Sequence, residues 1–92
     1  MNAPDDGMGR HPYLAAQTIQ LLAPLDGMME ITLREPTVDE IAKVNDDSQK
    51  HGSVRAMKNL IATMAHIEVA VVGRMGARDF NACNKYLATF FE

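Results

Sequence analysis

The hydrophobic pattern changes along the chain, from the two-residue period of strands to the longer period of helices. Apolar side chains dominate one face of two short runs, Thr18–Ala23 and Met28–Arg34, which is typical of half-buried strands. Asp26-Gly27 lies between them and suits a type I′ turn, because both central residues of that turn need positive φ. Pro24 cannot donate a ladder hydrogen bond, so it belongs near the end or at the edge of the first strand. The pattern predicts a hairpin that packs one face on the helices, with Met29, Ile31 and Leu33.

Residues 36–40 carry the signals of a helix start. Thr37 can cap a helix N-terminus, and Glu40 can return a bond to the Thr37 backbone. Asp39 and Glu40 are also favourable near the positive end of the helix dipole. We expect this helix to fade in Asn45–Gly52, where polar residues and glycine cluster.

The second half of the chain is helical in pattern. Apolar residues at i, i+3, i+4 and i+7 predict one long helix over Ser53–Met75. Glu68 falls at the edge of this stripe and is expected to reach solvent. A last helix over Ala77–Phe91 gathers one apolar face, comprising Phe80, Cys83, Leu87, Phe90 and Phe91. The predicted fold class is therefore α+β, an N-terminal β-hairpin packed on about three α-helices.

The 92 residues fit one domain. Residues 1–17, rich in Gly, Pro and Asp at the start, are interpreted as a flexible N-terminal tail. Residues 18–92 are interpreted as a single α+β domain. A chain of this size buries only about 60% of its unfolded surface, so its core is modest. We therefore expect homo-oligomers, with isologous contacts through the long helix.

Charge and composition limit the compartment in which the protein works and the kinds of partner it can bind. The net charge of -3 and the pI of about 5.5 argue against binding duplex DNA, which usually needs a basic face. No apolar run approaches the roughly 20 residues of a membrane span, and the polar first ten residues do not resemble a secretory signal. The single cysteine fits a reducing compartment. These features predict a cytoplasmic protein that binds neither nucleic acid nor a membrane.

Residues that could carry chemistry are scattered. His11, His51 and His66 have no partner at a zinc-ligand spacing, and His66 is interpreted as a partly exposed helical residue. Cys83 lies on an apolar helix face, where a free cysteine usually behaves as a small buried hydrophobe. Nucleophile elbows, phosphate loops and dinucleotide fingerprints are absent from the sequence. We therefore predict no catalytic, metal or cofactor site, and a protein that is not an enzyme.

The segment Leu22–Thr37, which ends in Leu-Arg-Glu-Pro-Thr, resembles the tail assembly chaperones of Mu-like and related contractile-tailed phages. The layout downstream is also similar, with Asp79 near the start of a final helix and Phe90-Phe91 near its end. The resemblance covers about Thr18 to Glu92. Gly73–Gly76 departs from the family, in which Leu and Pro often precede the last helix.

The resemblance implies a function. Such chaperones bind the long helical tape measure protein of a phage tail and keep it soluble until tube subunits polymerise around it, and some relatives also exist in a frameshifted longer form. The adaptable methionines and the surplus of apolar side chains predict a partner-binding surface. Its candidate residues are Met57, Ile61, Met64, Phe90 and Phe91. Arg34 and Glu35 are expected to fix the strand-to-helix corner instead.

The alternative interpretation is a small helix-turn-helix DNA-binding protein. Ser53–Met75, a turn at Gly76 and Ala77–Phe91 give its outline. The side chains that could face a groove are Arg78, Asn81, Asn84 and Lys85. The length of the first helix and the negative net charge weigh against it. A small enzyme is the third interpretation and lacks any acid–base or nucleophile constellation.

Overall fold

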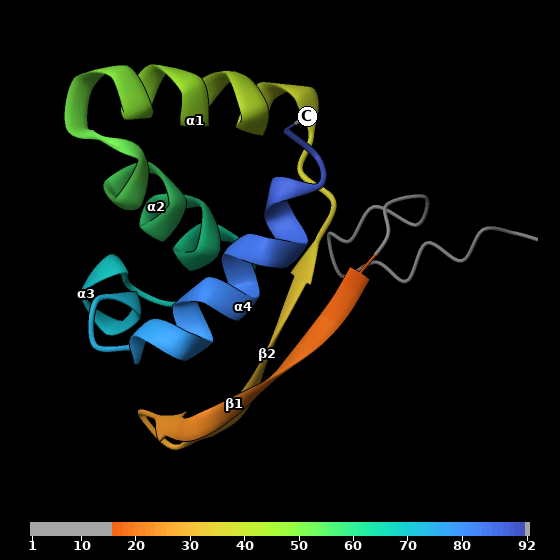
Figure 1. Cartoon of the computed structure of the whole chain (residues 1–92), viewed down its shortest axis with the longest axis vertical. Coiled ribbons are helices and arrows are strands. Elements are labelled where there is room, and N and C mark those ends of the chain that lie inside the picture. The colour runs from red at the N-terminus through yellow and green to blue at the C-terminus, as the bar shows by residue number, and fades with distance from the viewer. Residues whose placement is uncertain (1–15, 92) are drawn as a thin grey trace, which may run out of the picture.

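The computed structural model describes residues 16–91 as an α+β domain (Figure 1). Of the tail predicted at residues 1–17, residues 1–15 lie outside the described part, and Ala16 and Gln17 already belong to the first strand. A hairpin is followed by four helices, the third of them a single turn. The elements are β1 (Ala16–Leu25), β2 (Met28–Arg34), α1 (Val38–His51), α2 (Ser53–Ala65), α3 (Val69–Val72) and α4 (Ala77–Ala88).

The predicted hairpin is confirmed. β1 and β2 pair antiparallel, with Ile19 opposite Ile31. Asp26 and Gly27 have φ of 49° and 84°, the positive values that a type I′ turn requires. The register shifts between Gln20 and Leu25, so β1 carries an irregular stretch in which Pro24 can be accommodated without a ladder bond.

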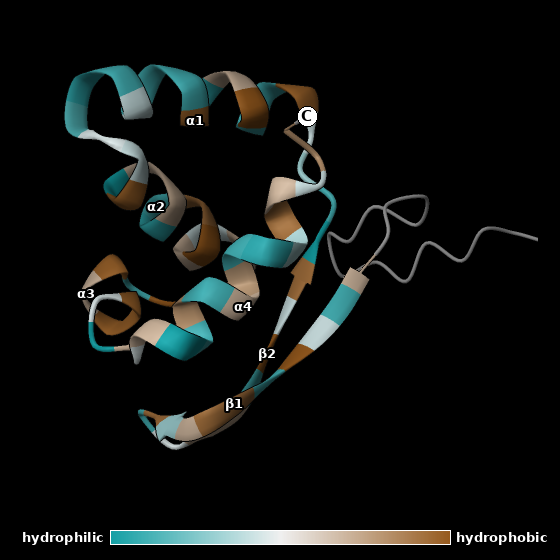
Figure 2. Cartoon of the chain, viewed as in Figure 1, coloured by the Kyte–Doolittle hydropathy of each residue, from teal (hydrophilic) through white to brown (hydrophobic). Residues whose placement is uncertain are grey.

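The core lies between the hairpin and the helices. α2 packs beside β2, and α4 packs along β1. Figure 2 shows α1 as mainly hydrophilic and α3 as mainly hydrophobic, so α1 contributes little to this core beyond Val44. The largest of its fully buried side chains are Leu33, Ile61, Leu87, Val72 and Cys83. The predicted fold class, a hairpin on helices, is thus confirmed.

The prediction that Met29 belongs to the buried face of the hairpin is wrong. Ile31 and Leu33 are 4% and 0% exposed, whereas Met29 is 59% exposed. Met29 lies in the part of β2 that faces the shifted stretch of β1, where regular cross-strand pairing is lost. Near the hairpin turn, therefore, the alternation of apolar and polar residues no longer predicts which side chains are buried.

The first helix is longer than predicted. It does not fade in Asn45–Gly52 but continues to His51. Two i,i+4 ion pairs, Lys43–Asp47 and Lys50–Asp46, lie on this stretch and support helix in a polar sequence. The helix ends at Gly52, whose φ of 88° and ψ of 160° are essentially restricted to glycine.

The single long helix predicted over Ser53–Met75 is wrong. α2 ends at Ala65, because His66 adopts a left-handed conformation with φ of 59°. The Ile67 N–H donates to the Ala62 carbonyl at 3.1 Å, closing the helix end in the manner of a Schellman motif. His66 is thus an exposed cap residue rather than part of a helix. Glu68 is exposed, as predicted.

The final helix is shorter than predicted. α4 ends at Ala88, so Phe90 and Phe91 lie beyond it in a turn. The Phe90 and Phe91 N–H groups donate to the carbonyls of Leu87 and Ala88. Both aromatic side chains remain partly buried.

Candidate functional site

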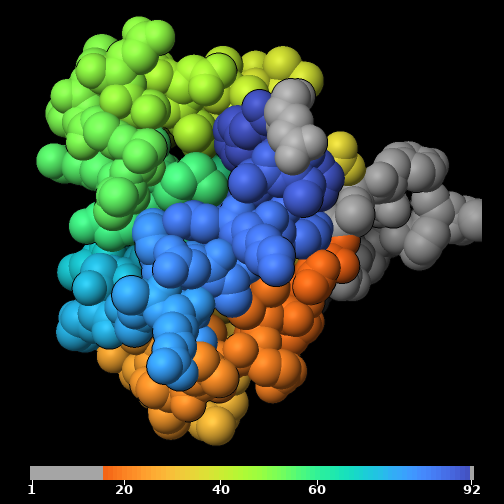
Figure 3. Space-filling model, in the orientation of Figure 1, coloured from red at the N-terminus to blue at the C-terminus, as the bar shows by residue number. Residues whose placement is uncertain are grey.

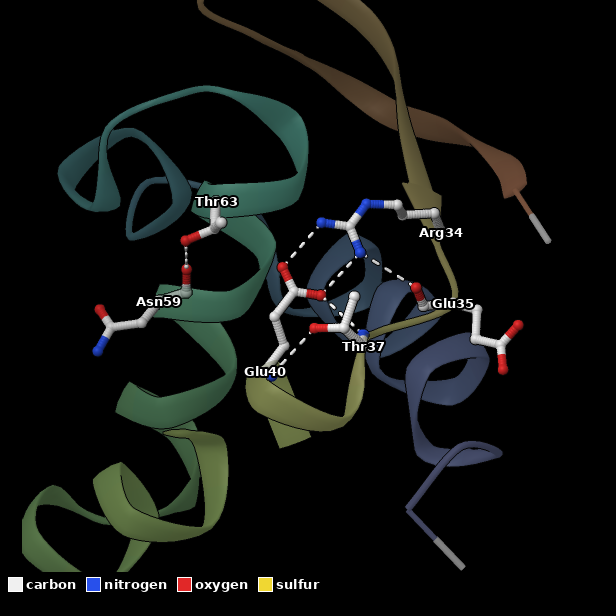
Figure 4. Close-up of polar contacts among 6 residues, drawn as sticks. All are labelled: Arg34, Glu35, Thr37, Glu40, Asn59 and Thr63. Atoms are coloured by element: carbon white, nitrogen blue, oxygen red, sulfur yellow. Dashed lines mark hydrogen bonds and ion pairs between the residues drawn. The ribbon is translucent and has the colours of Figure 1, made fainter. Parts of the chain in front are cut away.

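The corner between β2 and α1 is fixed by a charged network (Figure 4). The two terminal guanidinium nitrogens of Arg34 donate to the two carboxylate oxygens of Glu40, each at 2.7 Å. One of them also donates to the Glu35 carbonyl at 3.1 Å. Bidentate pairs of this kind fix geometry as well as charge. Arg34 is therefore a corner residue, as predicted, whereas Glu35 contributes its backbone carbonyl to the corner and directs its carboxylate away from it.

The predicted capping box is present in the same network. The Glu40 N–H donates to Thr37 Oγ1 at 3.2 Å, and the Thr37 N–H donates to Glu40 Oε1 at 2.9 Å. The hydrogen bonds from Arg34, with help from the Thr37 N–H, lower the pKa of Glu40 from 4.5 to about 2, although burial opposes the shift. Glu40 is thus held charged, and the start of α1 is locked to the end of β2.

A small groove lies between α1 and α2, next to this corner. Its volume is about 60 Å³. Buried apolar side chains line its floor, namely Val44, Ala56 and Leu60. Polar side chains form its rim, namely Glu40, Lys43, Asp47, Asn59 and Thr63. The groove is thus shaped for an apolar group with polar neighbours.

The rim side chains already make hydrogen bonds within the protein. Lys43 pairs with Asp47 at 3.1 Å, and Asn59 Nδ2 donates to Asp47 Oδ2 at 3.4 Å across the groove. Lys43, and then Asn59, lower the pKa of Asp47. Thr63 Oγ1 donates to the Asn59 carbonyl at 3.0 Å, and Figure 4 shows both residues along α2. The polar groups around the groove are therefore already held in place by bonds within the protein before any partner binds.

The candidate partner-binding residues lie in two places. Ile61 and Met64 on α2 are 0% and 7% exposed, so a partner reaches their side chains only if α2 moves. Met57 on α2 and Phe91 are partly buried against the core. Phe90 stacks edge-to-face on Tyr86, with ring centroids 5.3 Å apart. Three of these five side chains therefore keep exposed area in this conformation.

Asp79 joins the last helix to the first strand. Its side chain is buried, with 4% of the residue exposed. The Leu22 N–H donates to both carboxylate oxygens at 2.9 and 3.1 Å, and the Ala23 N–H donates to one of them at 3.4 Å. These donors belong to the irregular stretch of β1. The Leu22 side chain meanwhile is 72% exposed.

Sequence reasoning matched Asp79 to a family layout but missed this role. Pro24 marks a break in the regular ladder of β1, but nothing in the local sequence indicates that the freed N–H groups of Leu22 and Ala23 donate to Asp79. The sequence pattern also failed to predict that two valines on the helices are exposed to solvent. Val38 and Val54 are 81% and 61% exposed, although each sits at a position that fits an apolar helical stripe.

The described residues hold little that could do chemistry. Cys83 is 0% exposed, and burial, with a smaller effect of Asp79, raises the pKa of its thiol to about 11. The prediction that it is a buried hydrophobe is confirmed. Within residues 16–91, no three His, Cys, Asp or Glu side chains are grouped to hold a metal ion. None of the helices in this part of the chain is long and apolar enough to cross a membrane.

Comparison with known proteins identifies the class. Residues 27–92 match the family described as phage tail assembly chaperone proteins, E, or 41 or 14. The match includes β2 and all four helices, more than half of the chain, so the chain belongs to this family of phage tail assembly chaperones. No curated protein and no solved structure matches it.

Proposed function

We propose that this chain binds the tape measure protein of a phage or prophage tail and keeps it soluble while the tail is assembled in the host cytoplasm. The supporting observation is membership of the tail assembly chaperone family, combined with an open apolar groove between α1 and α2. The proposed role is binding, without catalysis or a cofactor.

The groove suits one apolar anchor of a helical partner. A cavity of about 60 Å³ is too small for a helix but can take part of an aliphatic side chain. Helix-in-groove recognition uses such anchors at helical spacing. Val44, Ala56 and Leu60 would remove the anchor from water, while the rim remains hydrogen-bonded. The affinity of one site is then modest, and several copies along one partner chain would supplement it.

The sequence-derived contacts extend this proposal. Met57, Phe90 and Phe91 keep exposed area and are proposed to contact the partner directly. Ile61 and Met64 are buried and would join the contact only after α2 is displaced. Met adapts to imperfectly repeated apolar partners, and Phe supplies rigid anchors.

Co-expression with a tape measure protein encoded nearby tests the groove. Thr63 is exposed at the rim, so Thr63→Arg should obstruct the groove without filling the core. Ala42→Arg is the matched control, because Ala42 is exposed on the same helix pair outside the groove lining. Wild type and Ala42→Arg should keep the partner in the supernatant, and Thr63→Arg should shift it to the pellet.

Phe91→Glu tests the second contact in the same assay. Its circular dichroism should remain that of wild type, and partner solubility should fall. If both Thr63→Arg and Phe91→Glu still solubilise the partner, these surfaces are not the binding site. If wild type itself leaves the partner in the pellet, the proposed function is refuted.

A further inference from the structure

The charges of the chain are divided between its two halves. Residues 16–52 contain seven acidic and three basic side chains, a balance of -4, and residues 53–91 contain two acidic and five basic, a balance of +3. The first half forms the hairpin and α1, and the second forms α2, α3 and α4. An asymmetry of this kind points to a complementary partner surface.

The basic surface lies on α4. Arg78 and Lys85 are exposed and seven residues apart, which places them on one side of the helix at about 10 Å along its axis. Ala82 is exposed between them. Neither cation has an ion pair within residues 16–91. Figure 3 shows α4 uncovered across one face of the molecule.

The acidic surface lies at the start of α1. Val38 is 81% exposed, and Glu35 and Asp39 flank it. Figure 4 shows the Glu35 carboxylate directed away from the Arg34–Glu40 pair. Among the described residues, neither Glu35 nor Asp39 has an ion-pair partner. The start of α1 thus carries an exposed apolar side chain and two carboxylates that have no ion-pair partner among the described residues.

We propose that the start of α1 in one copy docks on α4 of a second copy. Val38 packs against Ala82, and Glu35 and Asp39 face Arg78 and Lys85. The two surfaces come from different parts of the chain, so the contact is heterologous and repeats from head to tail. This differs from the isologous contact expected from an unbroken long helix, which the structure divides at His66.

The contact is weak and salt-sensitive by its chemistry. Exposed ion pairs contribute little individually, and at about 0.1 M salt charges are screened beyond about 10 Å. Copies held side by side on one partner chain would reach a much higher local concentration and so associate more readily. The contact itself needs no partner protein, so its test is independent of the proposed function.

Analytical ultracentrifugation of the full chain tests the charge pairing. The average mass should rise with concentration in about 20 mM salt and return to that of a monomer in about 500 mM salt. Arg78→Glu/Lys85→Glu should abolish association, and so should Glu35→Lys/Asp39→Lys. The four changes combined should restore it, because the charges are exchanged. A wild-type monomer throughout, or no restoration, overturns the proposal.

Cysteine cross-linking tests the packing. Val38→Cys and Ala82→Cys proteins are mixed and oxidised, and the control mixture replaces Val38→Cys by Val54→Cys, another exposed valine. Cys83 is 0% exposed and does not compete. The Val38–Ala82 mixture should give several-fold more disulfide dimer than the control mixture. Equal yields overturn the assignment to a second copy.

Discussion

Removal of the Asp79 carboxylate is expected to destabilise the whole domain. Asp79→Ala leaves the N–H groups of Leu22 and Ala23 without the acceptor that both now share. It also removes a negative charge from the first turn of α4, where it interacts favourably with the helix dipole. The change therefore loosens the attachment of α4 to β1 without removing any apolar side chain.

The size of the effect follows from the geometry. An unsatisfied donor at Leu22 costs about 1–3 kcal/mol, and the longer bond from Ala23 adds little, so we expect a loss of about 2–3 kcal/mol. A domain of this size is stable by about 4–11 kcal/mol. The melting temperature should therefore fall by about 8–24 °C. Asp79→Asn keeps one acceptor oxygen and should lose about half as much free energy.

Urea denaturation followed by circular dichroism measures this loss. Glu68→Ala is the matched control, because Glu68 is exposed and makes no side-chain cap bond at α3. The control should stay within about 0.5 kcal/mol of wild type. If the free energy of unfolding of Asp79→Ala also stays within about 0.5 kcal/mol of wild type, the carboxylate does not significantly stabilise the irregular stretch of β1, and the reasoning fails.

Three further substitutions and one reactivity assay test separate features. The Arg34 pair holds the pKa of Glu40 at about 2 instead of 4.5, so its stabilisation is complete above pH 4.5 and is lost as the pH falls toward 2. Denaturation at several pH values should therefore show a constant gap between wild type and Glu40→Gln above about pH 5, which narrows below it; an unchanged gap contradicts the pairing. Thr37→Ala should lower the free energy of unfolding by about 0.5–2 kcal/mol, and an unchanged urea midpoint would show that the cap is dispensable. Gly52→Ala should cost about 1–3 kcal/mol in the same measurement, since φ of 88° is strained for alanine although the space is open. Cys83, with a pKa of about 11, should react with a thiol reagent only after urea unfolding, and rapid reaction in the native state would disprove its burial.

Local signals in the sequence predicted the features that local chemistry decides. The Asp26-Gly27 turn and the Thr37–Glu40 box each contain within a few residues the groups that satisfy their own geometry. Alternation predicted the buried pair Ile31 and Leu33 equally well. These features do not depend on what packs against them.

The errors arise where tertiary structure overrides a local pattern. The apolar spacing runs through His66 without interruption, and a histidine carries no glycine-like signal for positive φ. By alternation Met29 belongs to the same strand face as Ile31, but the register shift leaves it without a paired residue on β1. The groove escaped prediction because its walls come from two helices, and residues such as Val44 and Leu60 read simply as core.

The bond from Leu22 to Asp79 also bears on the order in which the domain folds. The two residues are 57 positions apart, so β1 acquires its covering helix only after nearly the whole domain has been synthesised. Closing a loop of that length costs about 3–4 kcal/mol of chain entropy in a simple polymer estimate. A nascent chain that stops before Ala77 can therefore cover β2 with α2, but it exposes the apolar side of β1 that α4 covers in the complete domain.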